Sequence, residues 1–187
     1  MPDNKTYILP SVYFGPVQYF SKIIEAEKVI IEQFDTYSKQ TYRNRCVIMS
    51  ANGRLSLSIP VKKIHGNRTR MKDIIIDYDT NWQKDHKRGI ISAYKSSPFF
   101  EFYFDEYLWV FNTNNKYLLD LNLKLTELIL SQLQINKKIE LSEKYENIKP
   151  AEDYREIISP KKELSTDPDF KPTEYIQVFI TRHGFIP

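Results

Sequence analysis

The dipeptide Asn52-Gly53, set between two apolar stretches, constrains the fold of this chain more than any other feature. Asn-Gly is the preferred sequence of a type I′ turn, whose twist matches that of the two strands it joins. After the turn, aliphatic residues alternate with serines and a proline, as expected of a strand with one buried face. The sequence therefore predicts a β-hairpin made of residues 45–50 and 55–61.

Hydrophobic periodicity predicts further strands and helices around this hairpin. Helices are expected where apolar residues recur every three or four positions, and strands where β-branched residues cluster or alternate. The predicted strands cover 7–12, 28–34, 73–77, 138–141 and 175–180, and the predicted helices cover 16–26, 81–95, 99–108 and 116–133. The pattern favours an α/β fold, with a central mixed β-sheet and helices packed on it.

Length and proline content indicate one domain with an irregular C-terminal arm. A chain of 187 residues is long enough for one domain with its own hydrophobic core. Between residues 143 and 173 four prolines lie among charged residues, which predicts an extended, loop-rich arm. We therefore expect a single domain over residues 1–187.

Composition argues against several classes of protein. The one cysteine, Cys46, cannot form an intrachain disulfide, and no stretch approaches the roughly 18 apolar residues of a transmembrane helix. A soluble, cytoplasmic protein is therefore expected.

The net charge of +3, without a basic stripe, predicts no nucleic-acid partner. Because zinc-ligand spacing and a Gly-rich phosphate loop are both missing, no metal is expected and the cofactor stays unknown.

His86 is the first candidate for a catalytic residue. It lies in the helix predicted over 81–95, on the same face as Trp82 and Gly89. A glycine one turn away would leave room for a ligand, and a neutral imidazole can act as a general base toward an amine or hydroxyl group. The alternative is a structural histidine that forms a hydrogen bond across the core.

The second candidate is the tripeptide Arg43-Asn44-Arg45. On a strand, Arg43 and Arg45 would point to one face and Asn44 to the other. Two guanidinium groups on one face can bind a phosphate or carboxylate through paired hydrogen bonds. The alternative is that these arginines pair with carboxylates of the same chain, such as Glu32 or Asp35.

A strand-to-helix turn, Tyr13-Phe14-Gly15-Pro16, is a third candidate. The N–H groups at the start of a helix can hold an anion, and Tyr19, one turn further on, would line the same pocket. The alternative is a plain connection in which Gly15 relieves a strained turn.

Three further features have mainly structural interpretations. The run from Lys62 to Lys72 holds five Lys or Arg and one His without an acid, which predicts an exposed loop, either simply solvated or steering an anionic substrate. Cys46 is expected to be a buried structural residue rather than a nucleophile. The aromatic stripe between Phe99 and Tyr107 is interpreted as helix packing rather than ligand binding.

Several short segments, taken in order, resemble the WbqC-like protein family. They cover the chain from about residue 7 to residue 187. The matching segments are Tyr13-Phe14-Gly15-Pro16, Gln18-Tyr19-Phe20, residues 40–45, Ile59-Pro60-Val61, Trp82 with His86, Tyr94-Lys95, Pro98-Phe99-Phe100, Ser159-Pro160-Lys161 and residues 175–179. Similar proteins continue past the equivalent of Pro187 with another apolar segment, so we expect that this chain lacks a closing element or was shortened.

The resemblance implies a role in surface-polysaccharide (O-antigen) biosynthesis. Family members occur near such genes, and the resemblance also implies transfer of an aminoacyl or acyl group to an amino sugar. The expected substrate is an anionic sugar precursor, linked to a nucleotide or a lipid. In this hypothesis His86 is the general base, and the substrate-binding residues are Tyr13, Tyr19, Arg43, Asn44, Arg45, Trp82 and Tyr94. The alternative is a non-catalytic sugar- or nucleotide-binding partner of glycan-biosynthesis enzymes.

Overall fold

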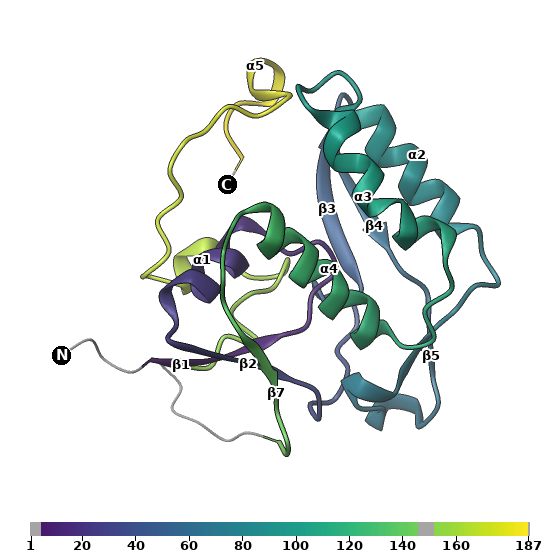
Figure 1. Cartoon of the computed structure of the whole chain (residues 1–187), viewed down its shortest axis with the longest axis vertical. Helices are drawn as coiled ribbons and strands as arrows, with labels where there is room; N and C mark the ends of the chain where they lie inside the picture. Colours follow the sequence, from purple (N-terminus) through teal and green to yellow (C-terminus); the bar gives the residue numbers. More distant parts are fainter. Residues whose placement is uncertain (1–4, 146–151, 187) are drawn as a thin grey trace.

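The computed structural model of the chain describes residues 5–145 and 152–186 and confirms the α/β class. Three parallel strands, β1 (Thr6–Pro10), β2 (Lys28–Glu32) and β7 (Ile139–Leu141), form one sheet in the order β1-β2-β7. The helix α1 (Val17–Glu25) provides the crossover that two neighbouring parallel strands need. These elements lie together in the left part of Figure 1.

The predicted hairpin is confirmed. The strands β3 (Arg45–Ser50) and β4 (Gly53–Ser58) pair in antiparallel register, with Ser50 opposite Gly53. Gly53 has a φ of +107°, in the left-handed region that glycine adopts without steric cost. The two residues between the strands are Ala51 and Asn52, so the turn lies one residue earlier than the predicted Asn52-Gly53 turn, and Gly53 is the first residue of β4.

A second antiparallel pair follows Pro60, which ends the ladder of β4. It consists of β5 (Val61–Lys63) and β6 (Ile74–Ile76), joined through the short 3-10 helices η1 (Gly66–Arg68) and η2 (Met71–Asp73). The parallel and antiparallel strands thus fall into three small sheets.

Three long helices complete the architecture. The helices α2 (Trp82–Tyr94) and α3 (Phe100–Asn112) form a helical hairpin that packs beside β3, on the right of Figure 1. The connection between them places Phe99 in the left-handed region, with a φ of +61°. The helix α4 (Leu118–Gln132) then runs between the helical hairpin and the parallel sheet.

Two hydrophobic cores meet at α4. One core lies between the helical hairpin and the antiparallel strands, and the other lies between the parallel sheet and α1. Helix α4 contributes Leu121 and Leu125 to the first core and Leu119 and Leu130 to the second. Its apolar residues therefore surround most of the helix instead of forming one narrow stripe.

The described part of the C-terminal arm is irregular, as predicted, but it is packed against the parallel sheet. The backbone N–H of Tyr154 donates to the carbonyl of Ile8 at 2.9 Å, beside a parallel bridge between Ile8 and Asp153. Tyr154 and Ile158 are buried in the core around α1. Further on, residues 164–166 form the 3-10 helix η4 (Leu164–Thr166).

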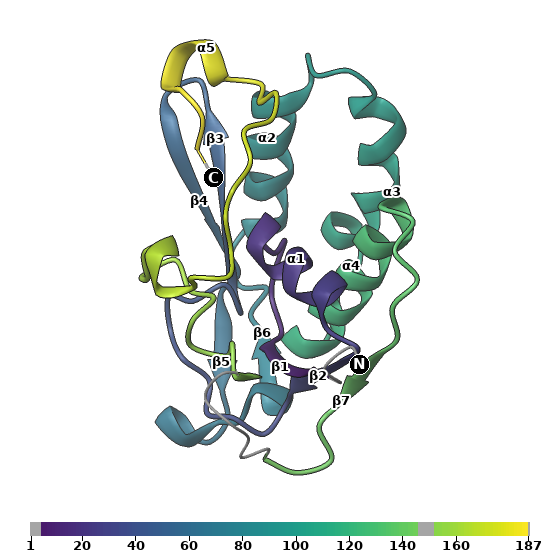
Figure 2. The same ribbon diagram turned by 90° about the vertical axis from the view of Figure 1, so that its left-hand side faces the viewer.

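The predicted strand over residues 175–180 is wrong. The segment is irregular and leads into α5 (Ile180–His183), and Ile176 is 95% exposed. An alternating pattern forms a strand only where a neighbouring strand satisfies its N–H and C=O groups. Here the side chain of Gln177 instead bonds both backbone groups of Ile186. Figure 2 shows this segment beside the tips of β3 and β4.

Gly15 offers a test of the turn between β1 and α1. A β-carbon at this position would lie 2.8 Å from Val12 Cγ2 and 3.1 Å from the Tyr19 ring, both in buried side chains. We expect Gly15→Ala to lower the free energy of unfolding by about 1–3 kcal/mol, because overpacking forces neighbours off their rotamers. Urea denaturation followed by circular dichroism would measure it.

Gly89→Ala is the matched control, because its new β-carbon would meet the methyl end of Leu55 at 3.2 Å within a helix. Alanine gains about 1 kcal/mol of helix propensity there, which offsets the contact. Equal losses in the two variants would contradict the account of the turn.

Candidate functional site

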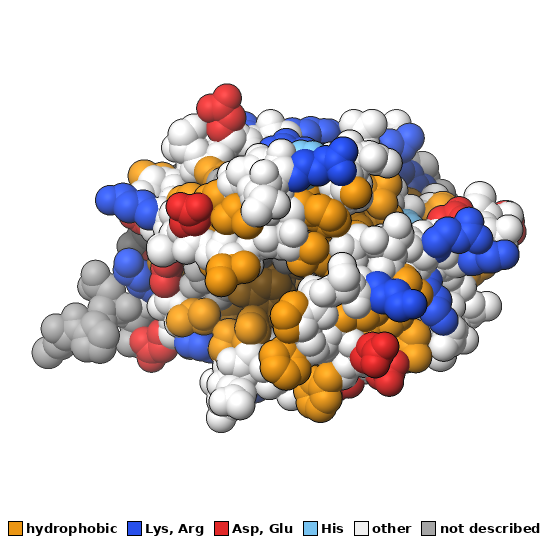
Figure 3. Space-filling view, turned by 90° about the horizontal axis from the view of Figure 1, so that it is seen from above, with side chains coloured by type: hydrophobic (Ala, Val, Ile, Leu, Met, Phe, Trp, Pro, Cys, Tyr) orange, Lys and Arg blue, Asp and Glu red, His pale blue; other side chains and the backbone are white. Residues whose placement is uncertain are grey.

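An aromatic cleft lies between β3, the α2–α3 helical hairpin and the turn before α1. It encloses about 420 Å³, a size typical of small-molecule sites. Its lining residues are Phe14, Gly15, Cys46, Val47, Ile48, Ile90, Tyr94, Ser97, Pro98, Phe100, Tyr103, Phe104 and Tyr107. Seen from above, the molecule has a hollow surrounded by hydrophobic side chains, in agreement with this lining (Figure 3).

The walls of the cleft are rings held against one another. Phe100 and Phe104 stack one turn apart on α3, with centroids 4.8 Å apart, and Phe14 meets Tyr107 across the cleft at 5.6 Å. The stripe that we interpreted as helix packing therefore serves two purposes, because part of it lines a ligand-sized space. The aromatic spacing was visible in the sequence, but nothing there indicated an open side.

The lining contains hydroxyl groups and one thiol but no ionised group. Among the described residues around the cleft, none is an acid, a lysine, an arginine or a histidine. Burial raises the pKa of Cys46 to about 12, so its thiol stays protonated near neutral pH. This agrees with the structural interpretation of Cys46. Burial, and then Glu106, raises the pKa of Tyr107 to about 12 as well.

Tyr94 is the one predicted substrate-binding residue that lines the cleft. The other aromatic candidates lie behind its wall or in the second core. Tyr13 and Trp82 belong to the core under the helical hairpin. Tyr19 is fully buried beside Phe20 in the core around α1, and burial raises the pKa of its hydroxyl group.

His86 lies within the core, where it contacts Tyr13 and Trp82. The Tyr13 hydroxyl group and His86 Nδ1 are 3.0 Å apart, and the Trp82 ring meets the imidazole edge-on at 5.1 Å. A backbone hydrogen bond with Ser58 also engages the ring. If the ring donates to Ser58, Nδ1 accepts from Tyr13. Burial lowers the pKa of His86 to about 4, and 4% of the residue is exposed.

His86 and Arg43 do not meet around a shared hollow, and neither lines the cleft. The expected space beside Gly89 is occupied by the side chains of Leu55 and Leu57. A glycine here lets β4 approach α2 closely, which explains the residue without a ligand. The role of His86 as a general base stays a prediction.

The expectation that Arg43 and Arg45 share one face of a strand is wrong. Strand β3 begins at Arg45, so Arg43 lies in the preceding turn and is 2% exposed. Its Nη2 lies 2.5 Å from Asp35 and 3.2 Å from Glu156, which confirms pairing with Asp35. Burial raises the pKa of Asp35, although Arg43 opposes this effect.

Arg45 and Asn44 form separate contacts. Arg45 is partly exposed and its Nε donates to Ser58 Oγ at 3.3 Å, across the β3–β4 ladder. The amide of Asn44 donates to the carbonyl of Ile59 at 2.9 Å. Both side chains therefore stabilise the hairpin end, and the tripeptide does not form one anion-binding face.

A second buried ion pair ties the C-terminal arm to the parallel sheet. Arg155 pairs with Asp153 and reaches Glu32, at the end of β2, at 3.3 Å. Ser142, just after β7, donates to the same Glu32 at 2.8 Å. These contacts lie at the carboxyl ends of β2 and β7.

The run from Lys62 to Lys72 is more ordered than the predicted loop. Lys62 pairs with Asp77 and Asp79, at 3.0 and 2.8 Å. Lys72 and Arg70 both lie over the ring of Phe34. Most of the positive charge on this surface therefore already has an intramolecular neighbour.

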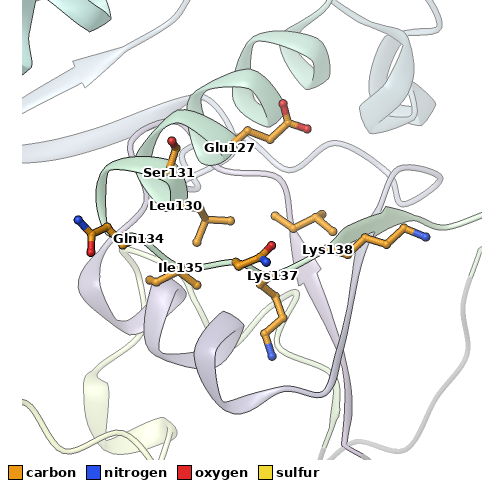
Figure 4. A pocket seen from close by; sticks show the side chains of 9 residues that line it. Glu127, Leu130, Ser131, Gln134, Ile135, Lys137 and Lys138 are labelled. Carbon is orange, nitrogen blue, oxygen red and sulfur yellow. The ribbon is translucent and has the colours of Figure 1, made fainter.

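A second hollow lies between the end of α4 and β7. Its volume is about 550 Å³, and Figure 4 shows the side chains that line it. The charged side chains of Glu127, Lys137 and Lys138 point away from one another. Lys137 is already engaged by the carbonyl of Ala26. This arrangement offers no convergent group of catalytic side chains.

The titration of His86 gives a prediction for stability. Between the ordinary pKa of 6.5 and about 4, the unfolded chain binds a proton that the folded imidazole does not. Lowering the pH through this window should therefore reduce the free energy of unfolding, by up to about 3 kcal/mol. His86→Asn, which keeps an acceptor for Tyr13, should be less stable at pH 7 but lose less on acidification.

Urea denaturation at several pH values would measure this effect. His65→Asn changes an exposed histidine and should keep the wild-type profile. An unchanged profile in His86→Asn would show that this imidazole titrates normally in the folded protein.

The two arginines give a matched pair of variants. Arg43→Met should lower the free energy of unfolding by about 3–5 kcal/mol, because it leaves the buried Asp35 carboxylate without this partner. Arg45→Met should cost about 0.5 kcal/mol or less, since its hydrogen bond is at the surface. Thermal and urea denaturation measure both, and an Asp35→Asn/Arg43→Met double variant should recover part of the loss. Equal effects of the single variants would refute the assignment.

The described residues show neither a metal-binding cluster nor a membrane-spanning helix. No three His, Cys, Asp or Glu residues in the described ranges are grouped so that they could hold a metal ion. None of the described helices is both long and apolar enough to cross a membrane.

Comparison with known proteins identifies the family. No curated protein and no solved structure matches the chain. A family model matches residues 11–177, which include every residue that lines the aromatic cleft, and the chain therefore belongs to the WbqC-like protein family.

Proposed function

We propose that the protein is a transferase that acylates an amino-sugar precursor of a surface polysaccharide, with the aromatic cleft as the site of one reactant. The cleft is the observation that carries this proposal. Residues far apart in the sequence, from Phe14 to Tyr107, converge on one apolar space. A concave, mostly apolar site with a few polar groups is typical of small-molecule binding.

The proposed reaction joins a sugar nitrogen to an acyl group. The amino nitrogen attacks the acyl carbonyl carbon, a C–N amide bond forms, and the bond to the leaving group of the donor breaks. A base takes the proton from the nitrogen. His86 is neutral at pH 7 and lies one helical turn from Ile90 in the cleft wall. To act as this base it must exchange its hydrogen bond with Tyr13 for one with the substrate.

The anionic part of a nucleotide- or lipid-linked sugar needs a partner other than Arg43, which is buried against carboxylates. Helix α1 begins at Val17, two residues after Gly15 in the cleft lining. The N-cap residue, Pro16, makes no side-chain cap hydrogen bond, and the Tyr19 N–H donates to the Pro16 carbonyl at 2.9 Å, which leaves the N–H groups of Val17 and Gln18 at the start of the helix. Because such groups favour phosphate and carboxylate, we propose that the anionic group binds at this end of the cleft.

One observation favours the second candidate, a non-catalytic binding partner of glycan-biosynthesis enzymes. The described lining offers no carboxylate, imidazole or amine to move a proton. A binding protein needs none of these groups, whereas a transferase must obtain one from His86 or from outside the cleft. The two functions differ in what the cell loses when the cleft is blocked.

Ile90→Trp is designed to fill the cleft from the α2 wall. Replacing the chromosomal copy with this variant should remove the N-acyl substituent of the amino sugar and leave the polysaccharide chain, as measured by mass spectrometry of purified polysaccharide. Loss of the whole polysaccharide would instead support the second candidate function, a non-catalytic binding partner of glycan-biosynthesis enzymes.

Ile24→Trp is the matched control, because Ile24 is 56% exposed on α1 and does not line the cleft. It should leave the polysaccharide unchanged. Unchanged polysaccharide in cells that carry a folded Ile90→Trp protein would refute both functions for this cleft.

A further inference from the structure

We infer that the aromatic cleft binds the acyl group, with its chain against the rings and its carbonyl oxygen at the free edge of β3, and that the sugar ring stays outside. The inference rests on the proposed function for its place in glycan synthesis. The binding chemistry itself follows from the lining and can be tested without any turnover.

The cleft has little hydrogen-bonding capacity for a sugar ring. The Tyr107 hydroxyl is taken up by Gln132, and the Ser97 hydroxyl donates to the carbonyl of Tyr94. The Tyr94 hydroxyl is engaged by the backbone of Met49. A ring hydroxyl buried without a partner weakens binding roughly 5- to 150-fold, so a pyranose with several hydroxyl groups is poorly matched. An acyl chain loses no hydrogen bonds here.

The polar groups of the lining that are open to a ligand are the Tyr103 hydroxyl, at a 45% exposed position, and the backbone of β3. Hydrogen-bonded and non-hydrogen-bonded pairs alternate along an antiparallel ladder. Ser50 and Gly53 flank the two-residue turn and form a hydrogen-bonded pair, so Val47 and Met49 direct their N–H and C=O groups away from β4. Among the described strands β3 pairs with β4 alone, which leaves this edge free of a ladder.

The lining of the cleft indicates that this free edge faces it. Tyr94 lines the cleft; burial raises the pKa of its hydroxyl group, and the backbone of Met49, which has the same orientation as Val47, opposes this effect. Cys46, Val47 and Ile48 all line the cleft, although neighbouring residues on a strand point to opposite faces. A cleft that touches three consecutive residues reaches the strand at its edge. The N–H of Val47 is therefore available to an acyl carbonyl oxygen.

An N-acylglucosamine series tests the inference, because it keeps the sugar constant while the chain grows. Isothermal titration with N-acetyl-, N-butanoyl-, N-hexanoyl- and N-octanoylglucosamine should show affinity rising about fourfold per methylene until the chain fills the cleft. Octyl glucoside, which lacks the acyl carbonyl, should bind roughly two- to tenfold more weakly than N-octanoylglucosamine. Amide exchange at Val47 should slow only with the acyl ligand.

The variants Ile90→Trp and Ile24→Trp show whether the dependence of affinity on chain length arises in the cleft. The chain-length dependence should be lost in Ile90→Trp and kept in Ile24→Trp. Tyr103→Ser, at a 45% exposed position in the cleft lining, should reduce it without a risk to folding. Equal affinities for all the N-acylglucosamines would mean that the cleft binds the sugar ring or binds none of these ligands. A chain dependence that survives in Ile90→Trp would mean binding to the exposed rings of Phe99 and Phe102, and either result overturns the inference.

This binding result is separate from the polysaccharide result. A chain-length dependence that is lost in Ile90→Trp, together with unchanged polysaccharide in cells, would support the acyl site and refute the proposed function. Loss of the N-acyl substituent in cells, together with a flat binding series, would support the function and refute the acyl site.

Discussion

The buried hydrogen bond between Tyr13 and His86 joins the two halves of this molecule. Tyr13 follows the strand β1 of the parallel sheet, but its side chain belongs to the core beneath the helical hairpin. The contact fixes the turn at Phe14 and Gly15 relative to α2, and both residues then line the cleft with Ile90. Because each partner is desolvated, losing one leaves the other unsatisfied and costs about 1–3 kcal/mol. The position of the cleft therefore depends on this contact behind its wall.

Buried ion pairs play the corresponding role at the carboxyl ends of the parallel strands. Arg43 connects Asp35 to Glu156 in the C-terminal arm, and Arg155 connects the arm to Glu32 at the end of β2. Taking such charges out of water is unfavourable, and their attraction recovers this only when the geometry is good. Their effect is to select one arrangement of the arm, whose proline-rich sequence has few ladder hydrogen bonds of its own. Arg43 and Arg155 thus act as structural residues; for Arg43, pairing with Asp35 was one of the two interpretations that the sequence left open.

Features that depend on neighbouring residues could be predicted from the sequence, whereas features that depend on contacts between distant residues could not. The Asn52-Gly53 hairpin and the amphipathic helices depend on neighbouring residues, and both are confirmed. The strand over 175–180 depends on a distant partner and is wrong. The contact between Tyr13 and His86 spans 73 residues, so the resemblance marked both without showing that they touch. Tyr94 was predicted at the site on the same grounds, whereas the aromatic face of α3 was missed because ring spacing is the same for a filled and an open surface.

Backbone strain occurs at one residue of the cleft lining and at one residue beside it. Phe14 and Phe99 have φ values of +46° and +61°, a region that costs a residue with a β-carbon roughly 1–2 kcal/mol. Phe14 lines the cleft, and Phe99 lies between two residues that do. A glycine at either position would relieve the strain, but it would remove a ring from the wall or from the rim. Strain of this kind persists where the surrounding packing determines the conformation and is concentrated at functional sites. Gln40 and Gln134 adopt the same conformation away from the cleft, with φ values of +59° and +57°, so the strain at Phe14 adds to the evidence of the lining but does not mark the cleft by itself.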